Sequence, residues 1–315
     1  MKRIASYDSM TFIVTIFLLS SNCGWILRNN LKSFKEAQLE TLDVNEKTRT
    51  YLLHVPKAQE NHSAKLPLVL VLHGRLGNGE IMMNDSGFNE IADREGFIVV
   101  YPNGIQKSWA DGRGATPADL EQIDDVQFLE KLIQHLLNLF PIAADRVFIV
   151  GHSNGGFMTQ RMLVEKSKLF KAGASVSSQL SEFVLRKDQP TEKVSVAFLA
   201  GTEDPTVPYY GGYVRDGGEI LSVEDSVNRW LQWNSCSKAS QTKTRDDKDD
   251  ATKLEIVSYD TCKEKTSVRL YKIVGGGHNW PGRDRKIPFS SLGNPTSELN
   301  AAEEIWQFFK TKLQP

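Results

Sequence analysis

The chain has 315 residues, 40% of them hydrophobic and 24% charged, which is the composition of an ordinary globular protein with ample core. Its formal net charge of -1 at pH 7 gives no electrostatic reason to expect nucleic acid or an anionic membrane surface as a partner. The length allows one large α/β domain or two small ones.

The first 23 residues have the parts of an export signal. Lys2 and Arg3 precede the apolar run 11–19, and small residues then lead to Cys23. The run is about half the ~20 residues that a membrane-spanning helix needs, and a buried N-terminal helix is the alternative. At Cys23, plain cleavage and lipidation both stay open, and a lipid anchor is the single membrane attachment expected. We expect an exported protein, either secreted, periplasmic or anchored at the cell surface.

Residues 24–40 are polar and without period, as in a linker, and residues 41–315 are expected to form a single domain. Alternation over 48–56 predicts an antiparallel edge strand that ends at a proline. Continuous apolar runs then predict strands buried on both faces, at 66–72, 97–101, 146–150 and 194–199.

Between these runs the apolar residues recur at helical spacing. Such stripes predict helices over 124–137, 222–233 and 297–312. Alternating strands and helices indicate a mostly parallel sheet with helices on both faces. The charged, hydrophobe-poor segment 241–253 is expected to be a solvated loop.

Ser153 lies at the centre of Gly-His-Ser-Asn-Gly, directly after a predicted strand and before a helical pattern. This is the sequence of a nucleophile elbow, a turn so tight that glycine is needed two residues before and after the serine. A serine hydroxyl needs an adjacent imidazole to become a nucleophile, and α/β-hydrolases order their triad Ser, then Asp or Glu, then His. His278 is the one histidine after Ser153, so it is the predicted base.

The acid of the triad should lie in a loop after a strand, between the serine and the histidine. Asp204 fits best, because its segment follows the strand predicted to end at Leu199. Its role would be to orient the histidine and stabilise the imidazolium. Glu203, beside it, and Asp260, at another strand end, remain alternatives.

An oxyanion hole needs two backbone N–H groups. We expect one from Asn154, immediately after the nucleophile, and the other from Arg75 in the loop that follows strand 66–72. His73, in the same loop, is expected to fix the loop near the substrate pocket. Trp109 and Trp280 are candidates for lining that pocket, with packing around the loops as the alternative.

Cys236 and Cys262 form an even pair once Cys23 is set aside, and in an exported protein such a pair predicts a disulfide. Two buried thiols are the alternative. The histidines and cysteines lack the spacing of metal ligands, and no glycine-rich phosphate loop opens a helix. We therefore expect no metal and no cofactor.

Motifs spread from about residue 48 to 312 resemble those of exported esterases grouped with poly(3-hydroxybutyrate) depolymerases and feruloyl esterases. The matching segments are 72–74, 100–104, 108–109, 124–129, 151–158, 201–209 and 275–282. The resemblance implies an α/β-hydrolase catalytic domain over 41–315 with Ser153, Asp204 and His278 as its triad. It also implies that Cys236 and Cys262 pair.

The resemblance further implies a serine carboxylesterase acting on a small-molecule or oligomeric ester of feruloyl, acetyl or hydroxybutyrate type. Arg75 stands where such proteins commonly carry a small residue or cysteine, and no further module follows residue 315. Both departures favour soluble aryl or short-chain esters over polymer granules. A cation at Arg75 is expected to favour anionic esters. A serine peptidase on the same fold and a non-catalytic surface binding protein are the alternative functions.

Overall fold

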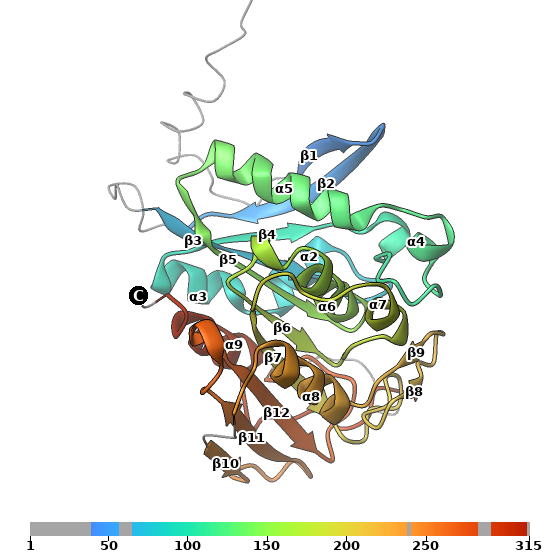
Figure 1. Ribbon diagram of the computed structural model, residues 1–315, viewed down its shortest axis with the longest axis vertical. Coiled ribbons are helices and arrows are strands. Elements are labelled where there is room, and N and C mark those ends of the chain that lie inside the picture. The colour runs from blue at the N-terminus through green and yellow to red at the C-terminus, as the bar shows by residue number, and fades with distance from the viewer. Residues whose placement is uncertain (1–38, 57–64, 238–240, 283–290, 314–315) are drawn as a thin grey trace, which may run out of the picture.

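The computed structural model describes residues 39–56, 65–237, 241–282 and 291–313, and their strands form one large twisted sheet (Figure 1). The central strands run parallel, and antiparallel strands close both ends of the sheet. In spatial order the strands are β1 (Leu39–Val44), β2 (Lys47–His54), β4 (Ile98–Pro102), β3 (Leu66–Leu72), β5 (Ile142–His152), β6 (Ala172–Val176), β7 (Ser195–Gly201), β12 (Val268–Val274), β11 (Lys253–Tyr259) and β10 (Gln241–Arg245).

Helices cover both faces of this sheet. The helices are α2 (Gly79–Asp85), α3 (Phe88–Glu95), α4 (Pro117–Leu120), α5 (Asp125–Leu139), α6 (Asn154–Glu165), α7 (Glu182–Lys187), α8 (Val223–Trp233) and α9 (Ala301–Lys310). One buried cluster joins the sheet to α5, α6 and α8, and a second joins its other face to α2, α3 and α9. The mostly parallel α/β architecture predicted by the alternation of strands and helices is therefore confirmed.

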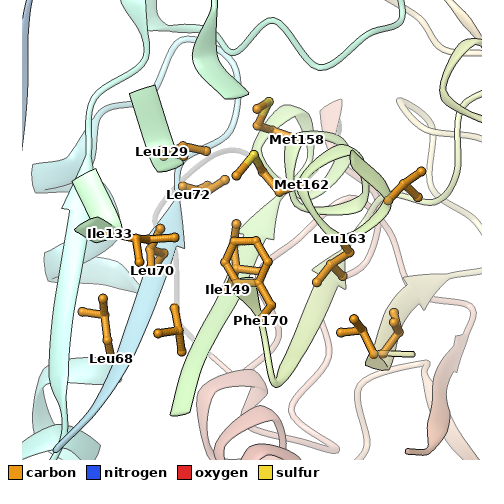
Figure 2. Close-up of a cluster of buried hydrophobic side chains, with 14 of the residues drawn as sticks. Leu68, Leu70, Leu72, Leu129, Ile133, Ile149, Met158, Met162, Leu163 and Phe170 are labelled. Carbon is orange, nitrogen blue, oxygen red and sulfur yellow. The ribbon is translucent and has the colours of Figure 1, made fainter. Parts of the chain in front are cut away.

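Strand β3 shows why the central strands are continuously apolar. Leu68, Leu70 and Leu72 point into the first cluster, where they meet Leu129 and Ile133 of α5 (Figure 2). Val69 and Val71 of β3 belong to the second cluster, on the opposite face. Because both faces are covered, every residue of β3 is buried, and each buried leucine stabilises the fold by about 2 kcal/mol.

The prediction for the first edge of the sheet was wrong in two ways. The strand predicted at 48–56 is β2, but it is not an edge, because β1 pairs with it on its outer side. Strand β1 begins at Leu39, so the last two residues of the predicted linker 24–40 belong to the sheet. The rest of that linker, with the export signal and Cys23, lies outside the described residues.

The prediction of a loop over 241–253 holds for residues 246–252 and was wrong for the residues on either side. The first part of this segment is β10, which pairs antiparallel with β11 along the other edge of the sheet. Its side chains are mostly exposed, and charged side chains on an edge strand oppose pairing with other chains. An edge strand with both faces in water lacks the alternation by which strands are predicted from sequence.

A small hairpin, β8 (Gly212–Tyr213) and β9 (Glu219–Ile220), lies outside the main sheet. It follows β7 and stands near the carboxyl ends of the parallel strands, the edge of an α/β sheet where ligands bind. No helix in the described part of the chain is both long and apolar enough to span a membrane.

Candidate active site

Ser153 sits in the sharp turn between β5 and α6. Its backbone has φ 54° and ψ -121°, a strained conformation that residues at functional sites adopt. A Cβ added at Gly151 would lie 2.1 Å from the carbonyl oxygen of Gly155, and one at Gly155 would lie 2.5 Å from that of His73. Glycine is thus required on both sides of the serine, as the elbow motif predicts.

Three side chains that are distant in sequence form one hydrogen-bonded chain. The Oγ of Ser153 lies 2.9 Å from Nε2 of His278, and Nδ1 of His278 lies 2.7 Å from Oδ2 of Asp204. The imidazole and the carboxylate are almost fully buried, at 7% and 2% side-chain exposure, whereas the serine is partly exposed. This is the arrangement in which an imidazole can take a proton from a hydroxyl while a carboxylate fixes its tautomer.

Neighbouring strands bring the acid and the base together. Asp204 follows β7 and His278 follows β12, and these strands pair in parallel, so their carboxyl ends meet. The other oxygen of Asp204 accepts from the N–H groups of Thr206 and Val207, at 2.8 and 2.7 Å. These bonds orient the carboxylate toward the imidazole.

The alternative acids do not reach the histidine. Glu203 is exposed to solvent. Asp260 lies beyond β11 and pairs with Arg269 at 3.7 Å. Asp204 is therefore the one of the three carboxylates weighed that contacts His278.

The backbone N–H groups of Arg75 and Asn154 are available to a ligand. Among the hydrogen bonds of the described residues, neither group has an acceptor. That of Asn154 is the first of α6, where the orphan N–H groups of a helix end point outward. A Cβ added at Gly74, the residue before Arg75, would lie 3.4 Å from Cβ of Ser153, which places the Arg75 loop beside the nucleophile.

The side chain of Asn154 anchors the elbow to a neighbouring loop. It accepts from the backbone N–H of Trp109 at 2.7 Å, and it donates to the carbonyl of Trp109 at 3.0 Å and to Asp111 at 2.6 Å. All three residues are almost fully buried. Sequence reasoning missed Asp111 and this use of the Asn154 side chain, because the partners lie more than 40 residues apart with no shared motif.

Asp111 begins a chain of charged groups that reaches the surface. It pairs with Arg113 at 2.9 Å, Arg113 pairs with Asp216 at 3.0 Å, and Asp216 pairs with Arg75 at 2.8 Å. Burial raises the pKa of Asp111 to about 6, although Arg113 opposes the shift. Burial would also raise the pKa of Asp216, but the charge of Arg113 and the hydrogen bond from Arg75 outweigh it and lower that pKa.

A cavity of about 650 Å³ opens above the serine. Its wall is lined by Arg75, Leu76, Arg113, Ser153, Phe157, Thr206, Val214, Arg215, Asp216, His278 and Leu292. Phe157, one helical turn after the nucleophile, could have been found from its spacing. Val214, Arg215 and Leu292 come from loops, and no sequence signal marks them.

The three residues predicted to lie at the pocket do not line it. Trp109 is fully buried and donates its indole N–H to the carbonyl of His73, and Trp280 is buried and donates to the carbonyl of Ser86. Both pack beneath loops, which was the alternative expectation. His73 lies buried in the scaffold behind the serine.

His73 fixes its loop, as expected. Its Nε2 accepts from the N–H of Gly104 at 2.9 Å, so its Nδ1 carries the proton that bonds the carbonyl of Gly74 at 2.8 Å. Burial, and to a smaller extent the charge of Arg49, lower the pKa of His73 to about 4, although the hydrogen bond with the Gly74 carbonyl opposes the shift. The ring is therefore neutral at pH 7 and acts as a rigid link between two loops.

Cys236 and Cys262 are joined in a disulfide, as predicted, and it ties the end of α8 to the loop after β11. In the described part of the chain, no cluster of histidine, cysteine and acidic side chains could hold a metal ion.

Comparisons with known proteins agree with this architecture. The model of the prolyl oligopeptidase family matches residues 90–191. The putative esterase NocK of Nocardia uniformis subsp. tsuyamanensis is 27% identical over 275 residues, 83% of this chain and 79% of that protein. Feruloyl esterase B of Piromyces equi is 26% identical over 222 residues, 67% of this chain but 39% of that longer protein.

Among solved structures, an acetyl xylan esterase from Aspergillus awamori superposes with a TM-score of 0.58 at 13% identity, covering 87% of this chain and 99% of that one. At this identity the likeness shows the fold alone. The α/β-hydrolase fold class predicted from the sequence is thereby confirmed. The resemblance to feruloyl esterases is confirmed as well, whereas the relatives do not point specifically to depolymerases.

Proposed function

We propose that this chain, a carboxylesterase similar to feruloyl esterases, cleaves soluble esters through Ser153, His278 and Asp204. The observation that carries the proposal is the hydrogen-bonded chain of these three side chains at the base of a cavity. Its distances are those that proton transfer from a hydroxyl to an imidazole requires.

In the proposed reaction the Ser153 hydroxyl attacks the ester carbonyl carbon while its proton passes to Nε2 of His278. The imidazolium then protonates the departing alcohol, which leaves an acyl-enzyme. Water attacks that intermediate and gives a proton to the same imidazole, which then returns it to the Ser153 oxygen as the acid leaves. Asp204 stabilises the imidazolium, and the N–H groups of Arg75 and Asn154 stabilise the oxyanion of both tetrahedral intermediates.

The proposed substrates are soluble aryl or short-chain esters. Leu76, Phe157, Val214 and Leu292 give the cavity an apolar wall, which suits an aryl or a short acyl group. Feruloyl and acetyl esters are the first candidates, because relatives found by sequence carry those activities in their names. Hydroxybutyrate oligomers are the third.

A serine peptidase is the second candidate function, because the model of the prolyl oligopeptidase family matches residues 90–191. The two functions differ in the leaving group, an alcohol in one and an amine in the other. Proline p-nitroanilides and p-nitrophenyl acetate release chromophores of similar size, so their kcat/KM values compare amide and ester cleavage directly. Faster turnover of the anilide would favour the peptidase.

Export is part of the proposal. The disulfide supports it, because disulfides persist in oxidising compartments outside the cytosol. The predicted export signal lies outside the described residues, so cleavage or lipidation at Cys23 remains a prediction. Mass spectrometry of the N-terminal peptide from the exported fraction would distinguish an acylated Cys23 from a free new terminus.

The proposal is tested by replacing the nucleophile and the base. Ser153→Ala and His278→Ala should each abolish nearly all hydrolysis of p-nitrophenyl acetate, and the double variant should lose little more, because the residues act as a unit. Circular dichroism would show that the variants are folded. If folded Ser153→Ala kept more than about a tenth of the activity, a barrier change below ~1.4 kcal/mol, the nucleophile would be another group. Absence of hydrolysis by the wild-type protein would instead favour a non-catalytic binding protein.

A substrate panel would then identify the natural ester. The panel contains methyl ferulate, acetylated xylan, p-nitrophenyl esters of increasing acyl length and hydroxybutyrate oligomers. These esters differ in size and in whether the acyl or the alcohol half is bulky. The soluble-ester proposal predicts activity on the small members of the panel.

A further inference from the structure

The cavity above Ser153 combines apolar and cationic groups. Beside its aliphatic and aromatic wall, the described residues place three guanidinium groups there, those of Arg75, Arg113 and Arg215, and one carboxylate, that of Asp216. The sequence pointed to Arg75 as the cation that meets the substrate. Which of the three can bind an anion depends on which are already paired.

Two of the three guanidinium groups are already paired with carboxylates. Arg113 is 1% exposed and contacts both Asp111 and Asp216, and it also donates to the carbonyl of Gly217 at 2.9 Å. Arg75 donates to the second oxygen of Asp216 at 2.8 Å. The carboxylates of Asp111 and Asp216 therefore balance the charges of these two arginines. The lowered pKa of Asp216 keeps it ionised, so that it can pair with both.

Arg215 is the third guanidinium, and it has no such partner. Within the described ranges, no carboxylate lies within ion-pair distance of it, and its side chain is exposed at the cavity wall. An unpaired guanidinium beside an apolar wall can form two parallel hydrogen bonds with a carboxylate.

The backbone of Arg215 is held firmly although its side chain is free. Its N–H donates to the carbonyl of Thr206 at 3.0 Å, which ties it to the loop after Asp204. The next residue, Asp216, is bonded by two arginines. A Cβ added at Gly218 would lie 2.5 Å from the side chain of Arg113, so the turn of the β8–β9 hairpin packs directly on that arginine.

We propose that Arg215 binds a carboxylate of the substrate, and that the preferred esters join an apolar body near Ser153 to a carboxylate remote from the ester bond. This inference rests on the proposed esterase function and names its substrate class. Arg75 and Arg113 act differently, because with Asp216 they hold the hairpin that carries Arg215.

The test compares matched neutral and carboxylated esters. For the acyl side the pair is p-nitrophenyl butyrate and p-nitrophenyl hemisuccinate. For the alcohol side it is the acetates of 4-nitrophenol and of its 3-carboxy derivative. The pair that shows the larger preference identifies the half of the substrate that reaches Arg215.

We expect the wild-type enzyme to prefer the carboxylated member of at least one pair, and Arg215→Gln to lower that kcat/KM by about five-fold through KM, the scale of an exposed ion pair. The neutral member should change far less. Arg215→Lys should restore part of the preference, and high salt should weaken it. Arg75→Gln should lower the kcat/KM of the neutral and the carboxylated ester alike. As a control, Lys131→Gln on α5 removes one positive charge far from the site.

The inference would be overturned if the wild-type enzyme showed no preference in either pair, or if Arg215→Gln lowered both members equally. In those cases hydrolysis of the neutral esters, lost in Ser153→Ala, would still support the esterase. Absence of Ser153-dependent hydrolysis on all four esters would overturn the esterase proposal and this inference together.

Discussion

Two clusters of arginine and aspartate anchor the loop 103–116, and they differ in their access to water. In the inner pair, Arg49 and Asp125 lie 2.6 Å apart with side chains 2% and 0% exposed. In the mouth cluster, exposure rises along the chain from Asp111 and Arg113, at 0% and 1%, to Asp216 and Arg75, at 23% and 36%.

Each cluster organises backbone as well as charge. Asp125 accepts from the N–H of Ala110 at 2.7 Å, and Arg49 donates to the carbonyl of Asn103 and stacks 3.8 Å from the centre of the Phe128 ring. The inner pair thus serves the scaffold alone. The mouth cluster joins the loop 103–116 to the β8–β9 hairpin at the cavity, so its arginine–aspartate pairs link the scaffold to the site.

The largest effect should follow removal of Arg49. Arg49→Ala leaves Asp125 buried without its cation, and such changes cost about 3–5 kcal/mol of unfolding free energy. Urea denaturation would measure the loss, and the protein that remains folded should keep most of its kcat on p-nitrophenyl acetate. As a control, Arg94→Ala breaks the exposed pair with Glu303 and should cost under about 1 kcal/mol. Equal losses of unfolding free energy in the two variants would contradict the distinction between buried and exposed pairs.

The second prediction concerns the buried end of the mouth cluster. Arg113→Ala should lower the free energy of unfolding by about 3 kcal/mol, because the buried Asp111 loses its cation. Asp216 adds little to this loss, since it is partly exposed and water can replace Arg113 there. Unlike Arg49→Ala, Arg113→Ala should also lower kcat/KM of the folded enzyme, since the β8–β9 hairpin loses its anchor. Denaturation and kinetics on the same preparation separate the two effects. A folded Arg113→Ala enzyme with unchanged kcat/KM would mean that the hairpin does not shape the cavity.

The third prediction concerns pH, through His73 beside the inner pair. The unfolded chain protonates His73 below about pH 6.5. In the folded protein, burial and then the charge of Arg49 lower the pKa to about 4. The unfolded state therefore binds more protons between these values, so this stabilisation is complete above pH 6.5 and is lost as the pH falls toward 4.

The size of that loss should be about 3 kcal/mol, at ~1.4 kcal/mol for each unit of pKa shift. His73→Asn removes the titrating group but keeps a side chain that can donate to the carbonyl of Gly74. Denaturation series from pH 7 to pH 4 should be less steep for the variant than for the wild type. Parallel pH profiles would show that His73 is not the group responsible.

The smallest effect is expected at the exposed end of the mouth cluster. Arg75→Gln should cost less than about 1 kcal/mol of unfolding free energy, because the bond to Asp216 is partly hydrated and Asp216 keeps Arg113. Thermal unfolding with and without added salt measures this loss, which should shrink as salt screens the pair. A loss of unfolding free energy as large as that of Arg113→Ala would mean that exposure does not set the contribution of each arginine in the cluster.

Elements with strong local patterns were predicted well, and elements without them were missed. Strand β3 is apolar throughout, so its burial on both faces could be predicted. Strand β6 escaped prediction because alanine, glycine and serine dominate it. The structure gives the reason, since a Cβ added at Gly173 would lie 2.6 Å from Leu163, so α6 packs closely enough to require small residues.

Local chemistry and chain order within the sequence were enough to predict which side chains would meet at the site. Glycines around Ser153 mark the elbow because no other residue fits there, and the order of an α/β-hydrolase triad left His278 as the base. Charge pairing and burial were decided by tertiary contacts over long separations, such as the 141 residues between Arg75 and Asp216. That is why Trp109 proved to be a scaffold residue, and why Arg215, rather than Arg75, is the cavity arginine without a carboxylate partner among the described residues.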